Sequence, residues 1–227
     1  MQKTVFVVGL EFEDATDFLA AAESSGRRVF TTCETPPEMP AGEITYVPWK
    51  KNSSISARTA LLTVCNQVSV PDEVIFIFDA NRLAALLEDG EVPAYIRTME
   101  NFLMSYINMY KEVERVFKKN GRGRIVFVLR PGELFDVSAK ESNHETAITT
   151  PIAMAQGAFK NFAEGVCGDL KDSGNVGVTL VQDDGSAEAV FAAWLFSFLN
   201  EADSSPLRGW IRPGAKSKGL LSGLFKR

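Results

Sequence analysis

Apolar runs alternate with segments of helical periodicity along most of the chain. The apolar runs are short and continuous, as in strands covered on both faces, and the segments between them repeat apolar residues every three or four positions. The predicted strands are 4–9, 28–33, 44–49, 73–78, 125–129 and 176–181. The predicted helices are 14–25, 54–68, 92–119, 151–170 and 187–200. Since crossovers between parallel strands are right-handed, this order predicts an α/β fold with one doubly wound parallel sheet and helices on both faces.

Individual residues refine these helices. Asp14 is a plausible N-cap for the first one, and Pro151 suits the first turn of the helix predicted at 151–170. The helix predicted at 54–68 is expected to turn four residues inward: Ile55, Leu61, Leu62 and Cys65. Acidic residues 183–184 with Gly185 and Ser186 are expected to form a turn that caps the last helix.

The C-terminal end differs in kind from the rest of the chain. We expect one domain over residues 1–207 and a basic, amphipathic tail over residues 208–227. Residues 216–227 carry four positive charges and no negative charge, and their apolar residues share one helical face: Leu220, Leu221, Leu224 and Phe225. Two glycines in this stretch disfavour a stable free helix, so we expect the tail to be ordered only by contact. A partner subunit could order it, and an anionic membrane surface is the less favoured alternative.

Composition narrows the class of protein. The chain has 227 residues and a formal net charge of −5, which disfavours nucleic acid as the main partner. Its three cysteines are widely spaced, and its only histidine is His144, so we expect neither a disulfide framework nor a metal site. We see no leader segment and no apolar run long enough for a bilayer. The sequence therefore predicts a cytoplasmic protein.

The first predicted strand ends in Gly9, and the loop that follows is acidic. A strand, a glycine and then a helix is typical of a Rossmann dinucleotide-binding turn. A pyrophosphate there needs bare backbone N–H groups at the helix N-terminus. This loop instead places Glu11, Glu13 and Asp14 at that position. The pattern indicates a nucleotide-binding scaffold whose phosphate site carries the wrong charge.

Residues 3–207 resemble the short-chain dehydrogenase/reductase family. The resemblance rests on the run Asn120–Leu129 after the long helix, on the helix at 152–170 and on the segment 186–199. It implies that the family's phosphate-loop glycines fall at Gly9, Glu13 and Ala15. It also implies that the polar motif after the fourth strand becomes Phe-Asp-Ala-Asn, ending at Asn81.

The resemblance also implies where the family's catalytic groups would fall. The serine that orients the carbonyl falls at Arg130, the tyrosine acid/base near Ile152 and the lysine near Gln156. The proline–glycine pair of the nicotinamide pocket falls near residues 183–184. An isoleucine donates no proton and a glutamine supplies no charge, so hydride transfer would lack its acid. We therefore expect no catalytic residues, no cofactor-binding residues and no cofactor.

The alternative is an active oxidoreductase that binds NAD or NADP in a rearranged site. Lys160 or Tyr106, acting with Arg130, would then supply the proton and the phosphate contact. A regulatory domain whose ligand lacks phosphate is a further alternative.

The resemblance implies an oligomer formed through the helices at 92–119 and 151–170. The partner would be a second copy or an active dehydrogenase chain. Aromatic and methionine residues are enriched at interfaces, although the same stripe can serve as intrachain core. The interface candidates are Phe102, Tyr106, Met109, Tyr110, Phe159 and Phe162.

Overall fold

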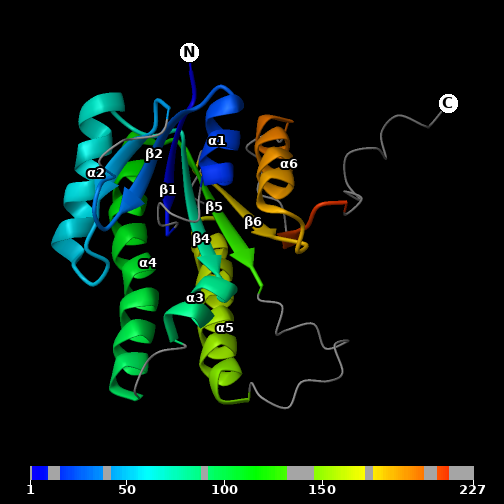
Figure 1. The fold of residues 1–227 in the computed structure, drawn as a ribbon. Coiled ribbons are helices and arrows are strands. Elements are labelled where there is room, and N and C mark those ends of the chain that lie inside the picture. The colour runs from blue at the N-terminus through cyan, green and yellow to red at the C-terminus, as the bar shows by residue number, and fades with distance from the viewer. Residues whose placement is uncertain are drawn as a thin grey trace.

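A seven-stranded parallel sheet runs through the molecule (Figure 1). The computed structural model describes residues 2–9, 16–37, 42–87, 92–131, 146–171, 176–201 and 209–214. The strands are β1 (Thr4–Val8), β2 (Arg28–Cys33), β3 (Thr45–Pro48), β4 (Glu73–Asp79), β5 (Gly123–Arg130), β6 (Val176–Gln182) and β7 (Trp210–Ile211). Their order in the sheet is β3-β2-β1-β4-β5-β6-β7, and every neighbouring pair is parallel.

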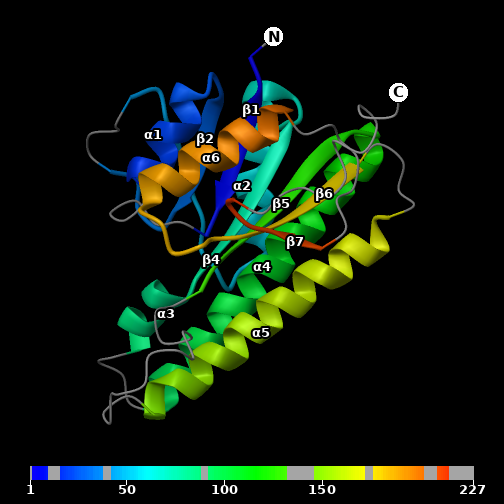
Figure 2. The same cartoon turned by 90° about the vertical axis from the view of Figure 1, so that its right-hand side faces the viewer.

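Helices cover both faces of the sheet. They are α1 (Thr16–Ser24), α2 (Ser54–Val68), α3 (Ala80–Leu87), α4 (Val92–Asn120), α5 (Thr146–Asp169) and α6 (Glu188–Glu201). Helices α1 and α6 pack on one face, and α2, α4 and α5 pack on the other (Figures 1 and 2). Successive strand residues point to opposite faces, so Val5 and Val7 join the first layer while Phe6 and Val8 join the second. The predicted α/β fold with a doubly wound parallel sheet is confirmed.

Two elements were missing from the sequence prediction. Helix α3 follows β4 without a break, so its start carries no turn signal. Strand β7 has two residues, too few for a period to be recognised, and it pairs with β6 beyond the boundary predicted at residue 207.

Helix α5 begins at Thr146, five residues before the predicted start, and contains Pro151. A proline removes one helical hydrogen bond and can be accommodated inside a helix when neighbours hold the turn. The cap predicted at Asp14 lies outside the described residues.

Helix α2 has the predicted bounds but a different inward face. Its buried side chains are Ala57, Ala60, Leu61 and Val64. The prediction that Ile55 and Leu62 turn inward was wrong, since they are 78% and 47% exposed. Small alanines on the inward face let the helix lie close to the sheet and α4. Ile55 and Leu62 lie on the opposite side of the helix and face outward.

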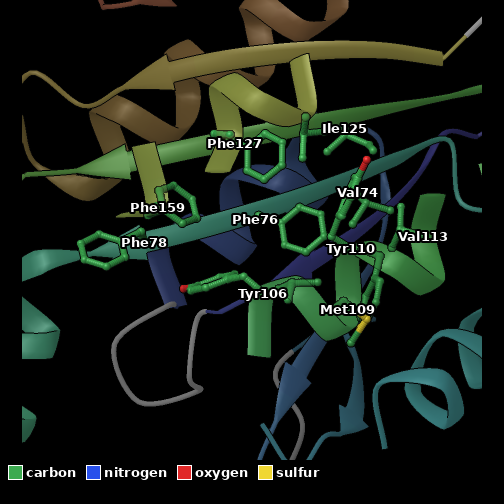
Figure 3. Packing of buried hydrophobic residues seen from close by; sticks show 14 of the residues in the cluster. Val74, Phe76, Phe78, Tyr106, Met109, Tyr110, Val113, Ile125, Phe127 and Phe159 are labelled. Atoms are coloured by element: carbon green, nitrogen blue, oxygen red, sulfur yellow. The ribbon is translucent and has the colours of Figure 1, made fainter. Parts of the chain in front are cut away.

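Aromatic side chains fill the layer between the sheet and helices α4 and α5. Phe76 of β4 and Phe127 of β5 are stacked with ring centroids 5.3 Å apart (Figure 3). Tyr106 meets Phe159 edge to face at 5.1 Å. Burying one such ring stabilises the fold by about 1.5–3 kcal/mol, so this layer is a major part of the core.

The residues predicted for an intersubunit contact lie in this core instead. Five of them are at most 5% exposed: Phe102, Tyr106, Met109, Tyr110 and Phe159. Phe162 is half-buried and packs against the same cluster. A helix on a sheet needs a wide apolar face, and the sheet uses most of the aromatic stripe. The outward residues of α4 and α5 are a different set: Ile96, Met104, Ile107 and Met154.

A buried ion pair lies at the amino ends of the strands. Arg27 is 1% exposed, and its Nε donates to Glu73 Oε2 at 2.6 Å. Its Nη2 donates to the other carboxylate oxygen at 3.3 Å, and the Ser25 hydroxyl accepts from Nη1 at 2.7 Å. Arg124 and Lys3 approach the same carboxylate at 3.6 and 4.0 Å. Glu73 therefore links the start of β4 to β2, β5 and the N-terminal segment.

We predict that Glu73→Leu destabilises the protein by about 3–5 kcal/mol, because it leaves the Arg27 guanidinium buried without its carboxylate. Arg27→Met should cost less, since Arg124 and Lys3 still face Glu73. Urea unfolding measures both. Arg28→Met, at an exposed neighbouring arginine, is the control and should change stability by less than about 0.5 kcal/mol. An equal effect of Glu73→Leu and Arg28→Met would contradict the prediction.

Candidate functional site

The carboxyl ends of the strands meet at one edge of the sheet, with a topological switch between β1 and β4. From β1 the chain builds outward through β2 and β3, and β4 then starts the other half on the opposite side. Open α/β sheets bind ligands at this crevice. Gly9 follows β1, Asp79 ends β4, Arg130 ends β5 and Asp183 follows β6. These positions define the candidate site.

The phenol of Tyr106 fills the space beside Gly9. Its hydroxyl donates to the carbonyl of Ile77, and the side chain is 2% exposed. Gly9 has a positive φ of 100°, and a Cβ there would lie 2.5 Å from the Ile77 oxygen and 2.7 Å from the Tyr106 oxygen. The Gly9 N–H donates to the Thr32 hydroxyl at 3.3 Å. Glycine is thus required here by the close approach of Tyr106 as well as by the backbone.

Figure 3 shows Tyr106 extending from α4 along the underside of β4. Burial raises the pKa of this phenol far above its usual value. Tyr106 is therefore a neutral hydrogen-bond donor at every physiological pH. Its hydroxyl makes its hydrogen bond within the chain, to the Ile77 carbonyl.

Arg130 binds three carboxylates from three different segments. Its Nε donates to Asp183 Oδ2 at 3.0 Å, and its Nη1 lies 2.9 Å from Glu188 Oε1 and 3.1 Å from Asp79 Oδ2. The four side chains are between 4% and 20% exposed. We call them the Arg130 cluster. It ties the ends of β4 and β5 to the start of α6, and its net charge is negative when all four groups are ionised.

Burial and neighbouring charges together shift the pKa values of Asp183, Glu188 and Arg130. Burial raises the pKa values of Asp183 and Glu188, and the lowering effect of Arg130 does not fully offset it. Burial alone would lower the pKa of Arg130, but Asp79, Asp183 and Glu188 outweigh burial and raise it. The guanidinium therefore stays charged, and the raised pKa values of Asp183 and Glu188 mean that these two carboxylates take up a proton more readily than exposed ones.

The other sequence-predicted positions that the structure describes lie on α3 and α5. Ile152 of α5 is fully buried in the apolar core. Gln156 lies one turn further on, and its buried Oε1 has no hydrogen-bond partner among the described residues. Asn81 is exposed at the start of α3, and Lys160 is exposed on α5. Glu11, Glu13, Asp14 and Ala15 lie outside the described residues, as does His144.

Lys51 and Arg82 belong to the same edge and were not singled out from the sequence. Burial, together with the nearby charge of Arg82, lowers the pKa of Lys51 to about 8. The Lys51 Nζ lies 5.9 Å from the centroid of the Phe102 ring. The backbone N–H of Arg82 donates to Asp79 Oδ1 at 3.2 Å, which caps the start of α3. Their position in the sequence could have identified them, because polar residues just after parallel strands gather at the carboxyl edge.

Within the described ranges, no three histidine, cysteine or acidic side chains are grouped so that they could hold a metal ion. None of the helices in those ranges is long and apolar enough to cross a membrane.

Sequence similarity to known proteins is weak. No family model matches the sequence. A protein of Treponema pallidum (strain Nichols), whose name records no function, is 24% identical over 174 residues, covering 75% of this chain and 74% of that protein.

Solved structures match over nearly the whole length. A short-chain dehydrogenase/reductase family oxidoreductase of Aeromonas hydrophila subsp. hydrophila ATCC 7966 aligns with a TM-score of 0.71 at 13% identity, covering 92% of this chain and 97% of that one. A short-chain dehydrogenase of Leptospira borgpetersenii with bound NAD+ gives 0.65 at 14% identity and 91% coverage of each chain. A metagenomic short-chain oxidoreductase in complex with NADP gives 0.67 at 14% identity, covering 93% and 97%. This chain therefore has the fold of short-chain dehydrogenases.

We predict that Arg130→Met destabilises the protein by about 3–5 kcal/mol, because it leaves three partly buried carboxylates together. Glu188→Gln should cost less than about 1 kcal/mol, since two carboxylates still bind Arg130. Without Arg130 the folded pKa values of Asp183 and Glu188 rise further, so their charged forms destabilise the fold above those values and protonation relieves it. The deficit of Arg130→Met should therefore shrink as the pH falls from about 7 toward about 4.

Urea unfolding at several pH values measures this dependence. Arg115→Met on the exposed side of α4 serves as the control, and it should change stability by less than about 0.5 kcal/mol. A deficit of Arg130→Met that is constant over this pH range would be evidence against the cluster.

Proposed function

We propose that this chain is a non-catalytic protein with the short-chain dehydrogenase fold that acts as a subunit or scaffold. It pairs with a second copy of itself or with an active dehydrogenase chain. The observation that carries the proposal is that the edge where a dinucleotide would bind is occupied by the chain's own side chains. Tyr106 closes against Gly9, and Arg130 is held by three carboxylates.

The charges at this edge support the proposal. A pyrophosphate in the crevice would face Asp79, Asp183 and Glu188, and Arg130 would have to leave them to bind it. Two like charges about 6 Å apart repel by about 3 kcal/mol at an effective dielectric constant near 20. Several such pairs would cancel much of the binding free energy of a cofactor. The cluster is therefore better suited to holding the fold together than to holding a phosphate.

The alternative of an active oxidoreductase has less support. The Tyr106 hydroxyl donates a hydrogen bond to a backbone carbonyl, and burial raises its pKa, so it is a poor acid. Lys160 is exposed on α5, and Arg130 is already bound. Burial and Arg82 lower the pKa of Lys51 to about 8, so in an active enzyme Lys51 would be the acid to test first.

We predict no saturable binding of NAD+, NADH, NADP+ or NADPH by the purified chain. Calorimetric titration measures this directly. Arg130→Met is the companion variant, because it removes a cation that could bind a phosphate, so any binding by the native chain that depends on Arg130 would be lost in it. Clear binding of any of the four dinucleotides by the native chain would overturn the non-catalytic proposal and favour the alternative.

The proposed pairing surface is the outward side of α4 and α5. The two helices pack side by side on the same face of the sheet (Figures 1 and 2). On them Ile96, Met104 and Met154 are 56%, 48% and 67% exposed, and Ile107 is 37% exposed. Exposed apolar residues that share one surface mark a site of protein association. They replace the buried aromatic residues as the residues that would contact a partner.

We predict that Met154→Asp and Ile107→Asp convert an oligomer into a monomer, since each places a charge in the apolar contact. Light scattering after size exclusion measures the mass. Val190→Asp, at a 62% exposed residue of α6 on the other face of the sheet, is the control and should leave the mass unchanged. If the wild-type chain is monomeric and also fails to retain a dehydrogenase on purification from its host, the pairing proposal is wrong.

A further inference from the structure

Helix α6 is apolar on all sides, although it lies on the outside of the fold. Between residues 189 and 199 its only polar side chain is Ser197. A helix that is hydrophobic all round is normally covered on all sides. In Figure 2, α6 lies in front of the sheet, and no described element crosses its outer face. The composition of the helix and its position in the described structure therefore disagree.

The inner face of α6 is fully accounted for. Its buried residues pack against α1 and the sheet: Phe191, Ala192, Leu195, Phe196 and Leu199. The ring of Phe196 meets Phe18 of α1 edge to face at 5.3 Å. This contact also supports Arg27, whose guanidinium lies 5.0 Å from the Phe196 ring.

Beside the buried face, an apolar stripe with residues one helical turn apart runs from the outer side of the helix to a flank that partly packs on the core. It consists of Val190, Trp194 and Phe198, which we call the α6 stripe. Val190 is 62% exposed, and the other two are half-buried with their rings stacked at 5.6 Å. Carboxylates lie at both ends of the helix: Asp184 is exposed just before its start and Glu201 is exposed at its end, while Glu188 is bound to Arg130. The surface is thus apolar in the middle and acidic at each end.

The last twelve residues of the chain have the complementary pattern. Leu220, Leu221, Leu224 and Phe225 lie between Lys216 and Lys218 on one side and Lys226 and Arg227 on the other. The segment is apolar in the middle and basic at each end. Its ends are eleven residues apart, which spans about 17 Å as a helix and about 36 Å when extended. Helix α6 runs from Glu188 to Glu201 and is about 20 Å long at 1.5 Å per residue, which falls within that range.

The tail also starts close to this surface. Strand β7 pairs with β6, whose following turn leads into α6, and β7 lies beside α6 in both views (Figures 1 and 2). The described chain ends at Gly214, three residues after β7, and thirteen residues follow it. A segment tethered so near its target binds at a high effective concentration, so modest contacts are sufficient.

We propose that residues 216–227 dock on the α6 stripe of their own chain, with the leucines and Phe225 on Val190, Trp194 and Phe198 and the basic ends on the acidic ends of the helix. A second copy of α6 fits this surface less well. In a two-fold symmetric pairing the same patch faces itself, which brings acidic helix ends toward acidic helix ends. The carboxylates at both ends also repel the headgroups of an anionic membrane.

Photo-crosslinking tests the proposal in the full-length chain. We replace Phe225 with p-benzoylphenylalanine, irradiate a dilute sample and identify the linked peptides by mass spectrometry. The expected product has the mass of a single chain and links the tail to the peptide that contains residues 188–201. A matched variant changes Lys216, Lys218, Lys226 and Arg227 to glutamate and keeps the apolar residues. We expect it to lower the crosslink yield about tenfold, because it loses the ion pairs at both ends and gains repulsion.

A second measurement uses tryptophan fluorescence. The tail holds no tryptophan, so a change in acrylamide quenching upon deletion of residues 215–227 reports on Trp194 or Trp210 of the remaining chain. We expect the deletion to increase quenching about twofold, with an unchanged far-ultraviolet circular dichroism spectrum. Crosslinks found only in a product of two chains would assign the stripe to a second copy. A tail that crosslinks only to lipid in phosphatidylglycerol vesicles, with quenching unaffected by its deletion, would assign it to a membrane. Each of these outcomes overturns the proposal.

Discussion

The requirement that a parallel sheet be covered on both faces determines most of this structure. Every residue from Val5 to Val8 is buried, and they alternate between two separate apolar clusters. The larger cluster needs the wide aromatic face of α4, which is why Tyr106 and Phe159 are core residues. The smaller cluster needs α1 and α6. What remains outside, on α4, α5 and α6, is the apolar surface that the sheet does not use.

The same requirement places polar chemistry at the two edges of the sheet, where the strands and their apolar covering end. At the amino edge, Arg27 and Glu73 form a buried pair supported by Arg124. At the carboxyl edge, Arg130 gathers carboxylates from β4, the end of β6 and α6. In each case one residue ties together segments that are far apart in sequence. Removing the shared residue is costly, because it leaves the opposite charges buried without compensation.

Much of the fold could be predicted from the sequence because its signals are local. The bounds of β2 and α2 follow from apolar runs, and in the structure the Ser53 hydroxyl caps α2 by accepting from the Ser56 backbone N–H. Ile55 and Leu62 were misplaced because the face that α2 presents depends on how closely α4 approaches it. Strand β7 was missed because its two residues are held by pairing with β6 and carry no period of their own.

The candidate site was less accessible to sequence reasoning. Gly9 and Arg130 were identified, but their partners come from segments up to about a hundred residues away. Nothing local to Tyr106 shows that its hydroxyl reaches Ile77 beside Gly9. The Arg130 cluster likewise combines Asp79, Asp183 and Glu188, which only the sheet order brings together. The pKa values of Lys51 and Glu188 depend on burial, which is a property of the packed chain.

This chain shares its fold with short-chain dehydrogenases although only about one residue in seven is identical. The residues that determine the fold therefore differ in kind from those that determine function. Residues that determine the fold need only be apolar and of suitable size, and very different sequences meet that condition. Residues that determine function must have particular chemistry at the carboxyl edge. A site freed from binding a ligand can replace strained or unpaired polar groups with internal contacts, which increases stability. Tyr106 against Gly9, and Arg130 among its carboxylates, are internal contacts at the carboxyl edge, and they are what the proposed non-catalytic role would require of this site.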